Sequence, residues 1–170
     1  MKHLVLIAFS IALLALPPPL PVSARTPELA EAFNGAEIAW RDIGSGIKEA
    51  TKTGKPVVMV FHASWCSACK KYREVFKDAG VVAASREYVM ILIDADKDKQ
   101  ANGAFSPDGT YVPRTLFLDA EGEVSPALVG KDPKYPHTLD IEKPDELLAL
   151  MRKGSDVFAR PPPSETLKTL

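Results

Sequence analysis

The stretch Trp65-Cys66-Ser67-Ala68-Cys69-Lys70 holds the only two cysteines of this 170-residue chain. The apolar run Val57 to Phe61 comes shortly before it and predicts a strand that is buried on both faces of a sheet. Apolar residues recur at helical spacing directly after it, at Tyr72, Val75, Phe76 and Ala79. The sequence therefore predicts a strand, a Cys-x-x-Cys pair and a helix, in that order.

A Cys-x-x-Cys pair at the start of a helix suits thiol–disulfide exchange. The backbone brings the two sulfur atoms within reach of each other, and the free N–H groups and dipole of the helix favour a thiolate on the first. If the helix begins at Cys66, the Cys66 thiol stays partly exposed and attacks, whereas Cys69 lies deeper and resolves the mixed disulfide. We therefore predict that Cys66 and Cys69 are catalytic and form a redox-active disulfide. Trp65 offers a rigid apolar surface for a substrate.

Other uses of the two cysteines fit the sequence less well. A zinc site needs four ligands, and after the N-terminal segment only His62 and His137 remain as histidines. A c-type haem site needs a histidine where Lys70 stands. A purely structural disulfide stays open as an alternative, although so short a loop removes little entropy from the unfolded chain. We expect no metal and no cofactor.

Three further polar features are interpreted without a catalytic or metal-binding role. His62 ends the predicted strand, and a strand-capping role is favoured over tuning of the thiolate. His137 lies in a proline-containing loop and is predicted to be a surface residue. The run Asp94 to Asp98 has the rhythm of a calcium loop, but Lys99 and Phe105 replace the glycine and the glutamate that such a loop requires. We expect a solvated loop there.

The first 24 residues predict a signal peptide. Lys2 supplies a positive charge, Leu4 to Leu16 is apolar except for Ser10, and Val22-Ser23-Ala24 fits a cleavage site. An uncleaved membrane anchor is the alternative, but the apolar run is shorter than the roughly 20 residues that span a bilayer. We expect cleavage before Arg25, no stable membrane span afterwards, and a periplasmic or secreted protein.

The composition argues against one class of partner and favours another. The formal net charge is −1, and the sequence contains no basic run suited to nucleic acid. An exported protein meets an oxidising compartment, in which disulfides persist. We therefore expect protein substrates that carry thiols or disulfides, with an upstream redox partner as a further candidate.

The remaining elements follow from hydrophobic spacing and turn residues. We expect a short helix from Pro27 to Phe33 and a polar loop from Asp94 to Val112. Further helices are expected over Asp42 to Lys52, over Val81 to Arg86 and from Pro144 onward, and further strands over Glu37 to Trp40, Tyr88 to Ile93, Thr115 to Leu118 and Glu123 to Val129.

This order of elements and the Trp-Cys-x-x-Cys unit resemble the thioredoxin superfamily over roughly Glu37 to Met151. The nearest resemblance is to the small endoplasmic-reticulum thioredoxin-like disulfide oxidoreductases and the related anterior gradient proteins. It rests on the runs Phe105 to Arg114 and Ser64 to Lys70. Unlike the anterior gradient proteins this chain has both cysteines, and it ends without an endoplasmic-reticulum retrieval signal.

The resemblance implies further site residues. In thioredoxin-like folds a proline just before a strand is cis and packs beside the Cys pair, and Pro113 takes that position. The backbone of Val112 would then offer strand-like hydrogen bonds to an extended substrate. Thioredoxins also carry a buried carboxylate where Val60 stands and a lysine where Met90 stands. We therefore expect slow resolution of mixed disulfides, because Cys69 lacks the usual proton acceptor.

Together these features predict an α/β protein with a thioredoxin-like three-layer sandwich, in which a mixed central sheet has helices on both faces. The expected parts are a signal peptide (1–24), a lead-in (25–36), a thioredoxin-like domain (37–158) and a disordered tail (159–170). The expected function is protein-disulfide oxidoreduction of undetermined direction. The alternative is a non-catalytic binding module with a static disulfide.

Overall fold

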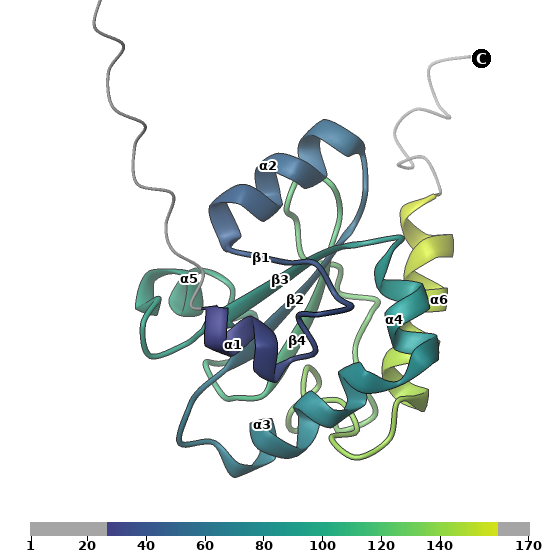
Figure 1. Ribbon diagram of the computed structural model, residues 1–170. Coiled ribbons are helices and arrows are strands. Elements are labelled where there is room, and N and C mark those ends of the chain that lie inside the picture. The colour runs from purple at the N-terminus through teal and green to yellow at the C-terminus, as the bar shows by residue number, and fades with distance from the viewer. Residues whose placement is uncertain (1–26, 160–170) are drawn as a thin grey trace, which may run out of the picture.

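A four-stranded sheet forms the centre of the structure, a computed structural model that describes residues 27–159 (Figure 1). Its strands are β1 (Trp40–Arg41), β2 (Val57–His62), β3 (Val89–Asp94) and β4 (Arg114–Leu118). They lie in the order β1-β3-β2-β4. β3 runs parallel to both β1 and β2, whereas β4 is antiparallel to β2. The predicted mixed sheet is confirmed.

Helices cover both faces of this sheet, as predicted (Figure 1). Residues of α2 (Ile43–Thr53) and α5 (Lys99–Ala104) pack on one face. The other face carries the remaining helical segments. These are α1 (Pro27–Ala32), α3 (Ser67–Tyr72), the 3-10 segment η1 (Arg73–Lys77), α4 (Ala79–Ser85) and α6 (Asp145–Phe158).

Strand β2 is the centre of both cores, because its side chains alternate between the two faces. Val58 and Val60 pack with α3, α4 and α6, whereas Val57, Met59 and Phe61 pack with α2 and α5. All five side chains are fully buried. Burial of one such side chain stabilises a fold by about 1.5–3 kcal/mol. The prediction of a strand buried on both faces is confirmed.

Helix α2 begins and ends at residues that suit its termini. Asp42 is the N-cap and accepts a hydrogen bond from the backbone N–H of Ser45, and Gly54 ends the helix in the left-handed conformation. Gly46 lies against β3, where a β-carbon would come within 2.5 Å of the Ile91 side chain. Glycine is unfavourable inside a helix, but here the missing side chain permits close packing of α2 on the sheet.

Two predicted elements differ from the structure. The strand expected over Glu123 to Val129 does not form, and only a bridge between Leu118 and Val124 is present. Pro126 follows that bridge closely, and proline cannot donate to a strand ladder. Conversely, the polar loop expected from Asp94 to Val112 contains α5, which Asp98 caps by accepting the N–H of Ala101.

The first predicted strand is also displaced, since β1 covers only Trp40 and Arg41. The signal peptide expected over residues 1–24 and all of the expected tail except Ala159 lie outside the described residues. Within 27–159, no helix has the length and apolarity to cross a bilayer.

Candidate redox site

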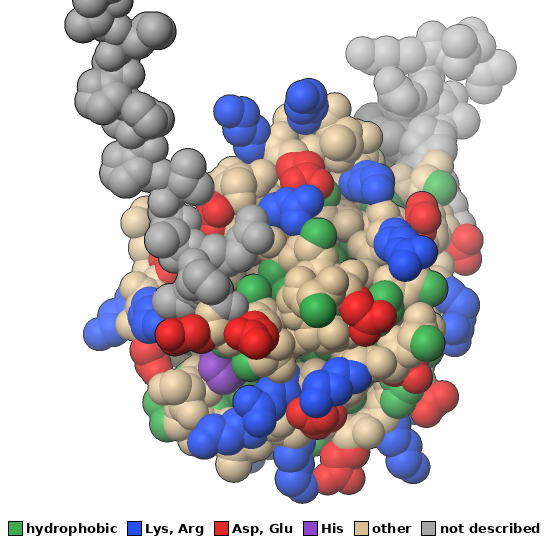
Figure 2. Space-filling model, in the orientation of Figure 1, with side chains coloured by type: hydrophobic (Ala, Val, Ile, Leu, Met, Phe, Trp, Pro, Cys, Tyr) green, Lys and Arg blue, Asp and Glu red, His purple; other side chains and the backbone are tan. Residues whose placement is uncertain are grey.

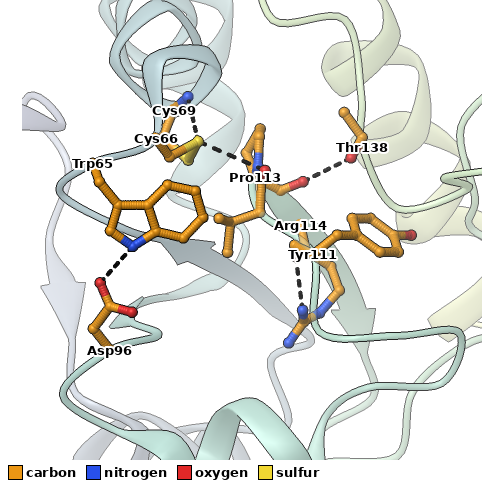
Figure 3. The surroundings of a disulfide bond; sticks show 9 residues. Trp65, Cys66, Cys69, Asp96, Tyr111, Pro113, Arg114 and Thr138 are labelled. Carbon is orange, nitrogen blue, oxygen red and sulfur yellow. Dashed lines mark hydrogen bonds between the residues drawn. A yellow bond between two sulfur atoms is a disulfide. The ribbon is translucent and has the colours of Figure 1, made fainter.

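The two cysteines form a disulfide at the N-terminus of α3, four residues beyond the end of β2. Their Cα atoms are 5.2 Å apart. Cys66 is the N-cap rather than the first helical residue, and the backbone N–H of Cys69 donates to its Sγ at 3.0 Å (Figure 3). The same N–H would also donate to a thiolate on Cys66 when the pair is reduced.

Both cysteines are buried, and Cys66 is slightly more exposed than Cys69. Cys66 is 5% exposed and Cys69 is 1% exposed. Ala63 and Val112 pack around them and account for the low exposure of Cys66, which is smaller than the sequence suggests. Cys66 is therefore the more accessible of the two cysteines to an incoming sulfur.

The Val112–Pro113 peptide bond is cis, as the resemblance implies. The carbonyl oxygen of Val112 lies 3.6 Å from the Sγ of Cys66, and the Val112 side chain packs against the Cys pair. Figure 3 shows Pro113 beside the two cysteines. The structure thus brings together two segments that are 46 residues apart in the chain.

Trp65 is the most exposed large apolar side chain of the described residues, at 70%. Its indole N–H donates to an oxygen of Asp96 at 2.9 Å (Figure 3). This hydrogen bond fixes the orientation of the ring next to Cys66 and leaves most of its surface open to solvent. Trp65 therefore presents an exposed apolar ring directly before Cys66 in the chain, and its use as a substrate surface stays a prediction.

An apolar side chain, Val60, occupies the position at which thioredoxins carry a buried carboxylate. Val60 is fully buried and its neighbours across the sheet are Leu92 on β3 and Thr115 on β4. The hydroxyl of Thr115 is hydrogen-bonded to that of Tyr72 at 2.9 Å, and burial raises the pKa of Tyr72 well above its usual value. Neutral hydroxyl groups therefore lie near Val60, where a thioredoxin has an ionisable group.

His62 lies at the end of β2 and faces several charged groups. Its ring packs edge-on against Phe33 with 5.4 Å between centroids, and its Nδ1 is buried without a hydrogen-bond partner. Burial lowers the pKa of His62, and the nearby Asp94 only partly opposes this effect. His62 is therefore neutral at pH 7, which agrees with the strand-ending role that the sequence favours.

The sequence of this chain matches a known protein family. A family model described as thioredoxin-like matches residues 39–120, a range that contains the Cys pair and Pro113. The chain contains a thioredoxin-like domain.

The thioredoxin-like domain has curated relatives of very different lengths. The thiol:disulfide interchange protein DsbD of Ralstonia nicotianae is 32% identical over 118 residues, which are 66% of this chain but only 18% of DsbD. Anterior gradient protein 3 of Xenopus tropicalis is 28% identical over 134 residues, which are 76% of this chain and 79% of that protein. The chain thus spans less than a fifth of DsbD and most of the anterior gradient protein.

Solved structures confirm the fold. A thioredoxin from Thermus thermophilus superposes with a TM-score of 0.51 at 18% identity, covering 69% of this chain and 86% of the thioredoxin. The Trxlp protein of Edwardsiella tarda gives a TM-score of 0.50 at 16% identity, covering 66% of this chain and 96% of Trxlp.

The surface position predicted for His137 is wrong. His137 is 5% exposed, and its Nδ1 lies 2.8 Å from an Asp108 oxygen. Its backbone carbonyl accepts the N–H of Thr115, so this part of the loop pairs with the outer edge of β4. The sequence carries no local signal for this, because Asp108 is 29 residues away and the loop has no strand pattern.

Asp108 also accepts a hydrogen bond from the hydroxyl of Tyr111. Partial burial opposes ionisation of Asp108, but the hydrogen bonds from Tyr111 and His137 outweigh it and lower the pKa of the carboxyl. Burial and the Asp108 carboxylate together raise the pKa of Tyr111 to about 12. The loop before Pro113 is therefore attached to the buried His137 by the hydrogen bonds that the more exposed Asp108 and Tyr111 form with it.

Arg114 is a residue of the site that sequence reasoning missed. It is the first residue of β4, directly after Pro113, and it is fully buried. The sequence does contain a signal for it, namely an arginine next to the apolar run of a predicted buried strand. An arginine that is fully buried needs hydrogen-bond partners, so this position indicates a structural role.

The aspartates of the calcium-like run have other roles. Asp96 accepts from Trp65, and Asp98 caps α5. Among residues 27–159, no group of three or more His, Cys, Asp or Glu side chains is arranged to hold a metal ion.

Proposed function

We propose that this chain is an exported thiol–disulfide oxidoreductase that acts on protein thiols or disulfides through Cys66 and Cys69. One observation carries the proposal: the disulfide lies at the N-terminus of α3, facing the Val112 carbonyl, with Cys66 the more exposed of the two cysteines. The similarity to DsbD, a thiol:disulfide interchange protein, supports the same reaction class.

The proposed exchange proceeds in two steps. The Cys66 thiolate attacks one sulfur of a substrate disulfide, a mixed disulfide forms, and the displaced substrate sulfur takes up a proton. The Cys69 thiolate then attacks the Sγ of Cys66 and displaces the second substrate sulfur, which is also protonated. The substrate gains two electrons and the Cys pair loses two. Starting from the oxidised pair, the same steps in reverse oxidise a substrate dithiol.

Trp65, Val112 and Pro113 are proposed to form the substrate surface. Trp65 and Pro113 both lie beside the cysteines (Figure 3), and the Val112 carbonyl lies 3.6 Å from the Sγ of Cys66. An extended substrate chain could pack on the ring while its backbone pairs with that of Val112.

Export is the second part of the proposal, and it rests on the sequence of residues 1–24 alone. Cleavage before Arg25 in a periplasmic or secreted protein is the expected outcome. Mass spectrometry of the N-terminus of the protein purified from its native compartment tests this. A mature chain that retains Met1 would contradict it.

Turnover of insulin disulfides by dithiothreitol tests the activity. The wild-type chain should accelerate insulin reduction, Cys66→Ser should abolish the acceleration, and Cys69→Ser should accumulate mixed disulfides with substrate. Ser67→Ala is the matched control within the same turn. If the chain leaves insulin reduction unaccelerated and its disulfide resists mild dithiols, the alternative of a binding module with a static disulfide holds.

The direction of electron flow depends on the reduction potential of the Cys66–Cys69 pair. A potential of about −270 mV would indicate a reductase, whereas a potential of about −120 mV would indicate an oxidant. Equilibration with defined glutathione mixtures, read by thiol alkylation, measures it.

A further inference from the structure

Arg114 carries a positive charge in a fully buried position without an acidic partner. None of the carboxylates in residues 27–159 lies within ion-pair distance of it. Its guanidinium lies 4.1 Å from the centroid of the Phe61 ring, and its Nε is buried without a hydrogen-bond partner. An apolar residue of the same volume would fill this space without the desolvation penalty that a buried charge incurs.

The contacts of the guanidinium join two separate segments of the chain. One terminal nitrogen donates to the carbonyl oxygen of Tyr111 at 2.9 Å. The other donates to Asn102 on α5, to its side-chain oxygen at 2.8 Å and its carbonyl at 3.2 Å. Both acceptor residues belong to the part of the chain that precedes the Val112–Pro113 bond. A planar guanidinium reaches two such acceptors at once, which an ammonium group does not.

Tyr111, whose carbonyl oxygen accepts a hydrogen bond from Arg114, also forms hydrogen bonds through its own hydroxyl group. Its hydroxyl donates to Asp108 and accepts the backbone N–H of His137. Tyr111 is directly followed by Val112, whose carbonyl oxygen lies 3.6 Å from the Sγ of Cys66. The position of the Val112 backbone relative to the sulfur atom therefore depends on how firmly Tyr111 is held.

We infer that Arg114 is a positioning residue of the redox site, which holds the loop between Asn102 and Val112 so that the Val112 backbone can receive a protein substrate. This inference rests on the function proposed above. A protein substrate needs both the sulfur atom and the aligned backbone of Val112, whereas a small disulfide needs only access to Cys66. Loss of the contacts of Arg114 should therefore affect protein substrates selectively.

The test compares Arg114→Met, Arg114→Lys and Asn102→Ala in the full chain. Arg114→Met keeps the volume and removes the charge and the hydrogen bonds, and Asn102→Ala removes an acceptor without changing the core. Arg41→Met is the matched control, because Arg41 forms a two-nitrogen contact with Glu49 at the opposite edge of the sheet.

We expect Arg114→Met to raise KM for insulin about ten- to a hundred-fold, with an unchanged rate of exchange with glutathione disulfide and an unchanged reduction potential. Arg114→Lys should be as impaired as Arg114→Met. Asn102→Ala should raise KM in the same direction, and the double variant Arg114→Met/Asn102→Ala should be no worse than Arg114→Met alone. Arg41→Met should leave all of these values unchanged.

The outcomes separate this inference from the proposed function. If the wild-type chain does not reduce insulin, the function fails and with it this inference. If the wild-type chain is active and folded Arg114→Met retains the wild-type KM for insulin, only the inference is overturned. An equal loss of activity with insulin and with glutathione disulfide would also overturn it, since that result would indicate a role in thiol reactivity. Wild-type KM in Arg114→Lys would overturn it as well, since the positive charge alone would then be sufficient.

Discussion

The hydroxyl groups of Tyr72 and Thr115 are hydrogen-bonded at 2.9 Å in the core, and Thr115 is the neighbour of Val60 across the sheet. All three side chains are essentially buried. Two paired hydroxyls and an apolar side chain thus occupy the part of the core in which thioredoxins carry a buried carboxylate. Resolution of a mixed disulfide by Cys69 is expected to be slow for this reason.

Val60→Asp should accelerate resolution, because an ionised carboxylate at this position would accept the proton of Cys69. Stopped-flow measurement of the decay of a mixed disulfide checks this, with Val60→Asn as the uncharged control. The same change should lower the free energy of unfolding by roughly 3–5 kcal/mol, since the carboxylate would have no partner with Met90 in place of a lysine. Equal rates for the Asp and Asn variants at neutral pH would refute the explanation.

Tyr72→Phe should destabilise the oxidised chain by about 1–3 kcal/mol, because it leaves the buried hydroxyl of Thr115 without its partner. The double variant Tyr72→Phe/Thr115→Val removes both hydroxyls and should recover most of this loss. Denaturant unfolding measures both values. Tyr135→Phe, at a partly exposed tyrosine, should have little effect. A double variant less stable than Tyr72→Phe would contradict the pairing.

His62 should make the fold less stable below neutral pH. Burial depresses its pKa in the folded chain, so the unfolded chain binds the proton first as the pH falls. The stabilising contribution is therefore complete above about pH 6.5, the ordinary value for histidine, and is lost as the pH falls through the lower folded value. The charged groups that face His62 are Asp94, Asp96, Arg73 and Lys70.

His62→Gln should flatten this dependence, because glutamine does not titrate. Thermal unfolding of both proteins between pH 7.5 and pH 5 provides the comparison, with the Cys pair oxidised throughout. The wild-type Tm should fall more steeply than that of the variant below pH 6.5. Parallel curves would show that His62 does not titrate differently in the folded and unfolded chains.

How much the sequence predicts can be judged residue by residue. The strand Val57–Phe61 follows from a local pattern and is correct, because burial on two faces leaves a direct trace in the sequence. The helical pattern after Cys66 is correct only in part, since it is divided among α3, the 3-10 segment η1 and α4. Pro113 could be placed only through the resemblance, since the neighbouring Val112 meets Cys66 across 46 residues of sequence.

Errors arose where a distant contact overrides a local pattern. His137 looked like a surface residue in a polar loop, but the edge of β4 and Asp108 bury it. The residues 123–129 looked like a strand, but they pair with β4 only around the Leu118–Val124 bridge, and the segment at His137 pairs with β4 at Thr115. The charge of Arg114 would have argued for exposure, although neutral acceptors on α5 and in the following loop hold it in the core.

Asp108→Asn should loosen the loop before Pro113. Asp108 is ionised at neutral pH, because the hydrogen bonds from Tyr111 and His137 lower its pKa despite partial burial. The substitution weakens both bonds and should lower the free energy of unfolding by about 1–2 kcal/mol. Faster amide hydrogen exchange in residues 105–112 should accompany it. Asp132→Asn, at an exposed turn, is the control, and unchanged exchange in Asp108→Asn would argue against the cluster.

Trp65→Ala should separate substrate binding from stability. The ring is 70% exposed, so its loss should change the free energy of unfolding by no more than about 0.5 kcal/mol. If the ring is the platform for a protein substrate, KM for insulin should rise about tenfold, since an aromatic anchor in a binding site contributes more than 1 kcal/mol. Trp65→Phe should retain part of the affinity, and Lys52→Ala on the exposed face of α2 is the control. An unchanged KM in Trp65→Ala would place the substrate elsewhere, on the Val112–Pro113 side of the disulfide.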